Sequence, residues 1–296
     1  MKKITTLLLF ISILLFACND SGNNSNTLNN PDTSSIPVIP EVVKVRDKVF
    51  SVPSPIQASF LVKEQNIAYN KDLLNNPDNY VNYLTSFKIS LNIGVYGANL
   101  GNLFIYDQLS ESAQYFSVIK KLSEQIGILN SINQDLLDRI DKNSQNKDSL
   151  MFLVSDIYKD IDSYLLDNDQ EDIGILIITG GWVESLYLLT TIAETYNNPE
   201  IVARIGEQKN PLNNLIELLQ PYYGTISDEF DYLVEKLIDI SIVFDAIDDV
   251  YTYQAPDVDP QNKITTINST TTYNISTENL ELISEKVENL RNWITE

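Results

Sequence analysis

Histidine is absent from this 296-residue sequence, and cysteine occurs only once, as Cys18. The lack of histidine excludes imidazole general bases, serine–histidine–aspartate triads and histidine-ligated metal sites. A single cysteine excludes a disulfide within the chain. Catalysis by this protein would therefore have to use carboxylates, Tyr, Lys, Ser or a metal ion bound through oxygen.

Basic residues are scarce beside acidic ones. The chain has 20 Lys and Arg against 41 Asp and Glu, which gives a formal net charge of −21. Since duplex affinity comes largely from Lys and Arg on phosphate, we do not expect nucleic acid as a partner. An anionic bilayer would also repel this chain, and we interpret the excess of acid as a solvated surface.

The N-terminus has the three parts of an export signal. Lys2 and Lys3 precede the apolar run Leu7–Phe16, and Cys18 follows. The run is shorter than the roughly 20 residues of a membrane span and fits a secretory signal. The segment Leu15–Cys18 resembles the lipobox of bacterial lipoproteins. This resemblance implies cleavage before Cys18 and acylation of Cys18 with a fatty acid such as palmitate. An ordinary signal peptide with an incidental cysteine is the alternative, but the sole cysteine stands where lipidation requires it.

Three regions are expected on this basis. Residues 1–17 would be the signal peptide, residues 18–35 a flexible tether, and residues 36–296 a single helical domain with an extended N-terminal arm. The tether is rich in Asn, Ser, Asp, Gly and Thr, so it cannot bury enough apolar surface to order itself. Acylated Cys18 would hold the domain to a bilayer of the cell envelope, with the outer membrane favoured over the inner.

The domain is predicted to be an all-α multi-helix bundle. Apolar residues recur at three- and four-residue steps along Phe230–Tyr251, and similar stripes occur at Leu122–Ile140 and Leu150–Leu166. A final helix is predicted at about Thr277–Thr295. We expect about seven to nine helices in total.

Two kinds of local signal refine this prediction. Asn-Pro-Asp at Asn76 and Asn-Pro-Glu at Asn198 are typical of helix starts, with Asn as the cap and Pro in the first turn. β-Branched runs near residues 42–50 and 264–273 predict minor extended structure. Residues 42–50 should be one short strand or an arm. Residues 264–273 should form a hairpin or pair with residues 42–50.

The apolar segment Ile173–Ala193 has two interpretations, a membrane span and a buried helix. Glu171, Asp172 and Glu194 flank it without any Lys or Arg, so positive-inside topology has no basis here. Glu184 near its middle would be costly in a bilayer. We therefore favour a helix buried at the centre of the bundle.

Glycines occur in two unusual segments. Gly94, Gly97 and Gly101 share one helix face, although each glycine costs roughly 1 kcal/mol relative to Ala in a helix. Either close helix packing or approach of a ligand to the backbone would offset that cost. The segment Thr179–Tyr187 again combines glycines with aromatic residues and adds an acid.

The segments Gly94–Tyr106 and Thr179–Tyr187 resemble a family of helical lipoproteins of Bacteroidetes. That family has Tyr-Gly-Ala early and Gly-Gly-Trp-x-Glu-x-Leu-Tyr later in its chain, and the likeness extends over about Val52–Tyr253. Ser54–Pro55 and Asp148–Leu150 are similar as well. The resemblance implies an envelope location and a helical fold, and it adds no mechanism.

Glu184 is the strongest candidate for a special role. An acid in an apolar helix is either paired with Lys, Arg or Tyr as a structural contact or placed to bind a ligand. We group Glu184 with Tyr96, Asn99, Trp182 and Tyr187 as a candidate ligand pocket.

Asp245, Asp248 and Asp249 form an Asp-x-x-Asp-Asp cluster that is expected on one helix. It faintly resembles the metal-binding helices of isoprenoid synthases, which need a second such helix and a basic pocket for diphosphate. Neither is evident in the sequence. We interpret the cluster as a solvated helix end and expect no metal ion and no cofactor.

The functional prediction is a membrane-anchored envelope lipoprotein that binds a ligand or an envelope partner and is not an enzyme. Its membrane partner would be the bilayer, through acylated Cys18. Two alternatives stay open. One is a carboxylate- or metal-dependent envelope enzyme, and the other is a structural or assembly component of an envelope complex.

Overall fold

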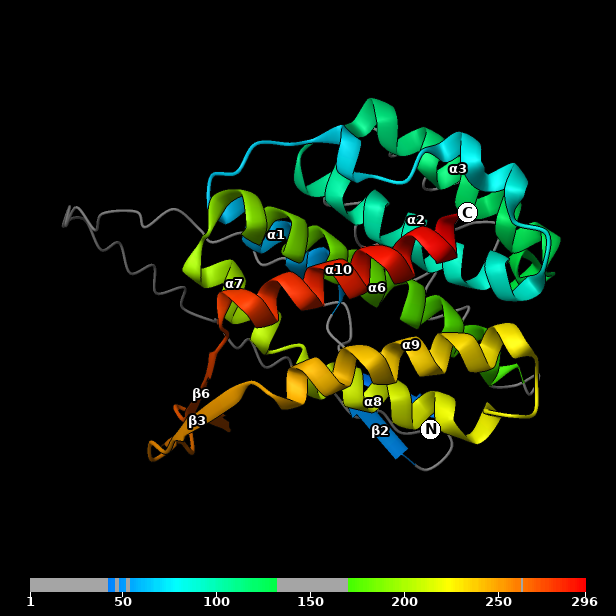
Figure 1. Ribbon diagram of the computed structural model, residues 1–296. Helices are drawn as coiled ribbons and strands as arrows, with labels where there is room; N and C mark the ends of the chain where they lie inside the picture. The colour runs from blue at the N-terminus through cyan, green and yellow to red at the C-terminus, as the bar shows by residue number, and fades with distance from the viewer. Residues whose placement is uncertain (1–41, 46–47, 52–53, 132–169, 262) are drawn as a thin grey trace, which may run out of the picture. The chain divides into compact units, whose positions relative to one another are not determined.

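The computed structural model describes residues 42–45, 48–51, 54–131, 170–261 and 263–296, all within the unit Pro37–Glu296 (Figure 1). The signal peptide, the tether, Asp148–Leu150, the stripe Leu150–Leu166 and the end of the stripe Leu122–Ile140 lie outside the described residues.

The prediction of an all-α bundle with minor strands is confirmed, because the described residues form eight α-helices and six short strands. The helices are α1 (Pro55–Glu64), α2 (Ser86–Ile105), α3 (Leu109–Gln125), α6 (Glu171–Tyr196), α7 (Pro199–Gly206), α8 (Lys209–Leu219), α9 (Asp228–Asp245) and α10 (Thr277–Thr295). Short 3-10 helices are η1 (Lys71–Leu73), η2 (Pro77–Asn82), η3 (Ile128–Ser131) and η4 (Gln220–Tyr222).

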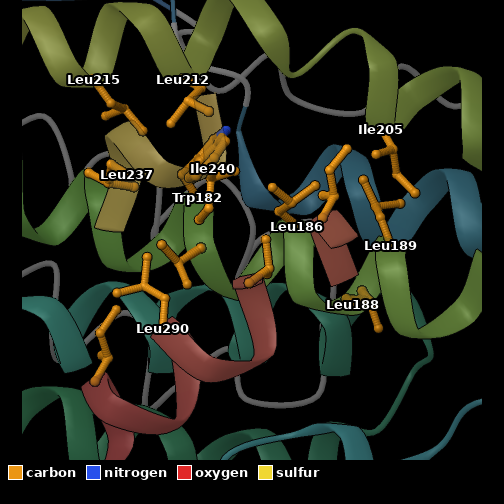
Figure 2. Packing of buried hydrophobic residues seen from close by; sticks show 14 of the residues in the cluster. Trp182, Leu186, Leu188, Leu189, Ile205, Leu212, Leu215, Leu237, Ile240 and Leu290 are labelled. Carbon is orange, nitrogen blue, oxygen red and sulfur yellow. The ribbon is translucent and has the colours of Figure 1, made fainter. Parts of the chain in front are cut away.

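Helix α6 is the centre of the bundle, in contact with α1, α2, α7, α8 and α10. In the described part of the chain, it is the one helix long and apolar enough to cross a membrane by length and composition. However, 72% of its apolar window is buried inside the protein. Figure 2 shows its side chains meeting those of α7, α8, α9 and α10 in one apolar cluster. This burial supports the interpretation of Ile173–Ala193 as a helix buried at the centre of the bundle and not as a membrane span.

Both Asn-Pro triplets begin helices. The Asn198 side chain accepts hydrogen bonds from the backbone N–H groups of Glu200 and Ile201 at 2.9 and 3.3 Å, and it caps α7. The Asn76 side chain likewise accepts from the N–H of Asp78 at 3.0 Å, but the helix it caps is the 3-10 helix η2. The cap chemistry is the same in both, and only the helix type differs.

The strands form three separate antiparallel pairs. Strands β1 (Val42–Val45) and β2 (Lys48–Ser51) pair with each other, so two strands stand where one strand or an arm was predicted. Strand β3 (Asp248–Thr252) pairs with β6 (Thr270–Asn274), and β4 (Asp257–Asp259) pairs with β5 (Ile264–Thr266). The second β-branched run therefore pairs with residues just before it and not with residues 42–50.

The prediction that one helix continues from Phe230 to Tyr251 is wrong at its C-terminal end. Helix α9 ends at Asp245, and the chain enters strand β3 at Asp248. Ile247 is buried although it lies beyond the helix, and Tyr251 is exposed on the strand. The apolar spacing of three and four residues continued past the helix end by coincidence, because pairing with β6 decides the conformation there.

The glycines of α2 and α6 bring the two helix backbones into direct contact. A Cβ atom on Gly94 would lie 1.9 Å from the carbonyl oxygen of Ile177, and one on Gly180 would lie 1.9 Å from that of Leu91. A Cβ on Gly101 would similarly lie 2.5 Å from a side-chain carbon of Ile56 in α1. Close helix packing, the first of the two explanations considered, thus accounts for Gly94, Gly101 and Gly180.

Alanine substitutions should reveal this contact. Gly94→Ala and Gly180→Ala should each lower the free energy of unfolding by about 3 kcal/mol, because the added methyl group meets backbone atoms that cannot rotate away. Gly181→Ala is the matched control, since its Cβ would lie 3.2 Å from the Pro55 ring and 3.4 Å from the Gly94 carbonyl oxygen, distances that need only a small adjustment. Urea denaturation measures all three, and equal losses in the three variants would contradict the proposed contact.

Candidate functional site

The Glu184 carboxylate lies at the centre of a buried polar cluster. It forms an ion pair with Arg291 of α10, with 3.0 Å between Oε2 and Nε, and its side chain is only 3% exposed. Its Oε1 also accepts hydrogen bonds from Arg291 Nη2 at 3.3 Å and from Asn99 Nδ2 of α2 at 2.7 Å. Glu184 was considered either as a structural contact or as a ligand-binding group. Its geometry here is that of a structural ion pair.

The Arg291 guanidinium is held in its charged form. Burial alone would lower its pKa, but the charge and hydrogen bonds of Glu184, together with Tyr187, outweigh burial and raise it. The guanidinium carbon lies 4.8 Å from the centroid of the Tyr187 ring, which is a cation–π geometry. Tyr187 therefore joins the cluster through Arg291.

Asn99 links this cluster to the C-terminal end of α10. Its Oδ1 accepts from the backbone N–H of Asn75 at 2.9 Å. Asn75 Nδ2 donates to the Tyr83 hydroxyl at 3.0 Å, and that hydroxyl donates to the carbonyl of Thr295 at 3.1 Å. A buried helix end needs such partners for its last carbonyl groups.

Helix α2 satisfies two further carbonyl groups at the end of α10. Asn92 Nδ2 donates to the carbonyl of Ile294 at 2.8 Å, and Lys88 Nζ donates to that of Trp293. Lys88 Nζ also lies 4.3 Å from the centroid of the Trp293 ring. A positive charge at this end of α10 complements its helix dipole.

Tyr96 lies within a group of buried tyrosines beside this cluster. Its hydroxyl donates to the carbonyl of Asn76 at 2.9 Å, and its ring lies 6.3 Å from Tyr83 and 6.0 Å from Tyr115, centroid to centroid. Burial, the nearby tyrosines and Glu184 raise the pKa of Tyr96 above its ordinary range. The neutral phenol is the form that this environment favours.

Trp182 lies apart from the other residues of the candidate pocket. Its indole Nε1 donates to Gln208 Oε1 at 3.1 Å, and the two residues line a cavity of about 20 Å³. Asn99 and Glu184 line a different cavity of about 10 Å³. Each cavity has room for about one water molecule. Asn99 thus joins Glu184 directly and Tyr187 joins it through Arg291, whereas Trp182 lies on another face of α6.

Arg291 is the central residue that the sequence analysis did not identify. It lies four residues after Val287 on the buried side of α10, in line with Ile283. Its position could have been recognised from the sequence as an arginine at a core position of an amphipathic helix. A buried guanidinium needs an acidic partner, so this position indicates a buried ion pair.

The acidic cluster is not on one helix, which corrects the prediction. Asp245 is the last residue of α9, whereas Asp248 and Asp249 belong to β3. Lys209 Nζ lies 4.0 Å from a carboxylate oxygen of Asp245 and 3.8 Å from one of Asp249. Among the described residues, no group of three or more acidic side chains is placed to hold a metal ion.

Comparisons with known proteins found no matching family model, no similar curated protein and no similar solved structure. The likeness of Gly94–Tyr106 and Thr179–Tyr187 to helical lipoproteins of Bacteroidetes stays a prediction.

Removing either partner of the buried ion pair should destabilise the protein strongly. Glu184→Gln or Arg291→Met should each lower the free energy of unfolding by about 3 to 5 kcal/mol, because the remaining charge is buried without its partner. The double variant should lose at least about 1 kcal/mol less than the sum of the two single variants.

The control for this cycle is Glu207→Gln. Glu207 pairs with Arg204 at 2.8 Å on the surface, so its loss should cost about 1 kcal/mol or less. Additive losses at Glu184 and Arg291, or a loss as large at Glu207, would show that the buried pair has no special role.

Stability should decrease at alkaline pH because tyrosines are buried. Burial with the nearby charge of Glu111 raises the pKa of Tyr69 from 10.0 to about 12, and burial with Tyr196 does the same for Tyr106. Unfolded tyrosines ionise near pH 10, whereas these two keep their protons in the folded protein. Their contribution is therefore complete below pH 10 and is lost as the pH rises to about 12.

Urea denaturation at a series of alkaline pH values measures this loss. Tyr69→Phe and Tyr106→Phe should each make the decline shallower, because phenylalanine has no proton to release. A decline equally steep in both variants would show that other groups cause it.

Proposed function

We propose that this protein is a lipid-anchored lipoprotein of the cell envelope that binds a ligand or a partner without catalysing a reaction. The observation that carries the proposal is the sequence Leu15–Cys18, which follows an apolar run and contains the sole cysteine. Two or three acyl chains on Cys18 would make a stable anchor, whereas one chain is marginal.

The non-catalytic part of the proposal is supported by the way the central polar groups are used. Both carboxylate oxygens of Glu184 bond to neighbouring side chains, and Asn99 bonds through its oxygen and its nitrogen. Groups that satisfy one another in a buried network serve structure, because a catalytic acid must reach its substrate. Turnover of an envelope substrate by the purified protein, with activity lost in Glu184→Gln, would contradict this part.

The anchoring part has a direct test in cells. Cys18→Ser should release the protein from the membrane fraction, because the thioether for the lipid cannot form. Asn19→Ser is the matched control and should stay in the membrane fraction. Fractionation followed by detection of the full chain measures both. If Cys18→Ser stays in the membrane pellet, lipidation of this cysteine is not the anchor, and helix α6 becomes the segment to examine.

A further inference from the structure

The connection between α9 and α10 is much longer than its position requires. The two helices pack against each other, and residues 246–276 join them. Packed helices in bundles are usually joined by about 2–8 residues. Joining α9 to α10 therefore does not explain the length of this segment.

Strands β3 to β6 lie within this connection, and we call residues 248–261 and 263–274 the ribbon. Figure 1 shows β3 and β6 leading away from the adjoining ends of α9 and α10. Every residue of β3, β4 and β5 is exposed, and in β6 only Tyr273 is partly buried. Two-stranded ribbons without a packed face are marginally stable in water, so little of the stability of the fold comes from this one.

The base of the ribbon is fixed to the bundle. Ile247, just before β3, is buried in the core, and Tyr273 of β6 packs on Gly206 of α7. A Cβ on Gly206 would lie only 2.4 Å from the Cβ of Tyr273. Lys209 Nζ lies 3.8 Å from an Asp249 carboxylate oxygen. These contacts hold the base of the ribbon in one position on the helices.

Hydrogen bonds also order the outer part of the ribbon. Asn268 Nδ2 donates to Asp257 Oδ2 at 2.9 Å, and the Ser269 hydroxyl donates to the carbonyl of Gln254 at 3.1 Å. The same hydroxyl accepts from the backbone N–H of Gln254 at 3.1 Å. A shape set before binding reduces the entropy lost on association.

Large apolar side chains are exposed along the ribbon from Val250 to Ile267. They are Val250, Tyr251, Tyr253, Val258, Ile264 and Ile267, which range from 50% to 76% exposed. Neighbours on a strand point to opposite faces, and the pairings Val250 with Thr272 and Tyr251 with Thr271 place apolar groups on both faces. A concentration of exposed apolar groups marks an interaction surface, and apolar groups on both faces fit a groove better than a flat surface.

Charge restricts what can bind there. The ribbon carries four acidic residues, Asp248, Asp249, Asp257 and Asp259, and among its described residues Lys263 is the one basic side chain. A complementary groove would be flanked by Lys or Arg. A second copy of this chain fits poorly, because its own net charge is −21.

We propose that the ribbon inserts into an apolar groove, flanked by Lys or Arg, on a different protein of the cell envelope. The inference rests on the proposed function for the compartment and for binding as the activity. The ribbon itself is assigned from its length, exposure and charge.

The test compares two triple variants of the full chain. Tyr253→Ser, Val258→Ser and Ile267→Ser together remove apolar groups from the ribbon. Val81→Ser, Leu84→Ser and Ile242→Ser together are the matched control, because these side chains are 60%, 84% and 61% exposed and are not part of the ribbon. Since all six side chains are exposed, both variants should melt at the temperature of the unaltered protein.

A photo-crosslinking amino acid at position 253, in cells, identifies the protein that contacts the ribbon, and a second one at position 84 serves as the comparison. The protein crosslinked at position 253 is then purified and its binding to each triple variant is measured. The ribbon variant should bind about tenfold more weakly or worse, the control variant should bind normally, and added salt should weaken the complex.

Several outcomes would overturn the proposal. Crosslinking of position 253 to a second copy of this chain, or binding that added salt does not weaken, would refute the partner chemistry. A partner captured only at position 84, with binding lost in the control variant, would refute the ribbon and leave the proposed function standing. No crosslinked protein at either position would refute the ribbon and partner binding together, while Cys18→Ser still reports on anchoring separately.

Discussion

The contact between the backbones of α2 and α6 is the constraint on which the rest of the structure depends. At Gly94 and Gly180 a Cβ on either helix would lie 1.9 Å from a carbonyl oxygen of the other. Each glycine weakens its own helix by about 1 kcal/mol relative to alanine, and dense packing between two long apolar helices offsets that cost. The close approach also brings polar side chains of the two helices within bonding distance, as the 2.7 Å between Asn99 and Glu184 shows.

The packed pair of α2 and α6 also determines where α10 lies, because side chains of both helices bond to it. A buried ion pair adds little net stability, because both charges lose their water, but a misplaced helix would leave one of them unpaired. The pair between Glu184 and Arg291 therefore restricts how α10 lies against α6. Bonds from Lys88 and Asn92 of α2 to the last carbonyl groups of α10 fix its end in the same way. Polar contacts thus add a directional constraint to the apolar packing of α10.

The two proposals concern different parts of the chain for a physical reason. In the described bundle, the polar groups around Glu184 bond one another, and the cavities beside them have room for about one water molecule. In the ribbon, apolar side chains remain in solvent although burial would stabilise them, as Ile267 at 76% exposure illustrates. A partner that covered those side chains would recover this free energy, which is why we assign binding to the ribbon and a structural role to Glu184.

Much of the helical framework could be predicted from the sequence because its signals are local. The helix predicted at about Thr277–Thr295 is α10, the Asn198 cap predicted the start of α7, and Glu184 with its acidic flanks argued for a buried α6. By itself, the sequence thus determined an all-α bundle with minor strands, and it supplies the basis for expecting an anchor at Cys18. Only the tertiary structure decided that α9 stops at Asp245, that Arg291 is the partner of Glu184, and that Trp182 faces away from both. Those features depend on residues far apart in the chain, such as positions 184 and 291, and local periodicity contains no information about which distant side chains will meet.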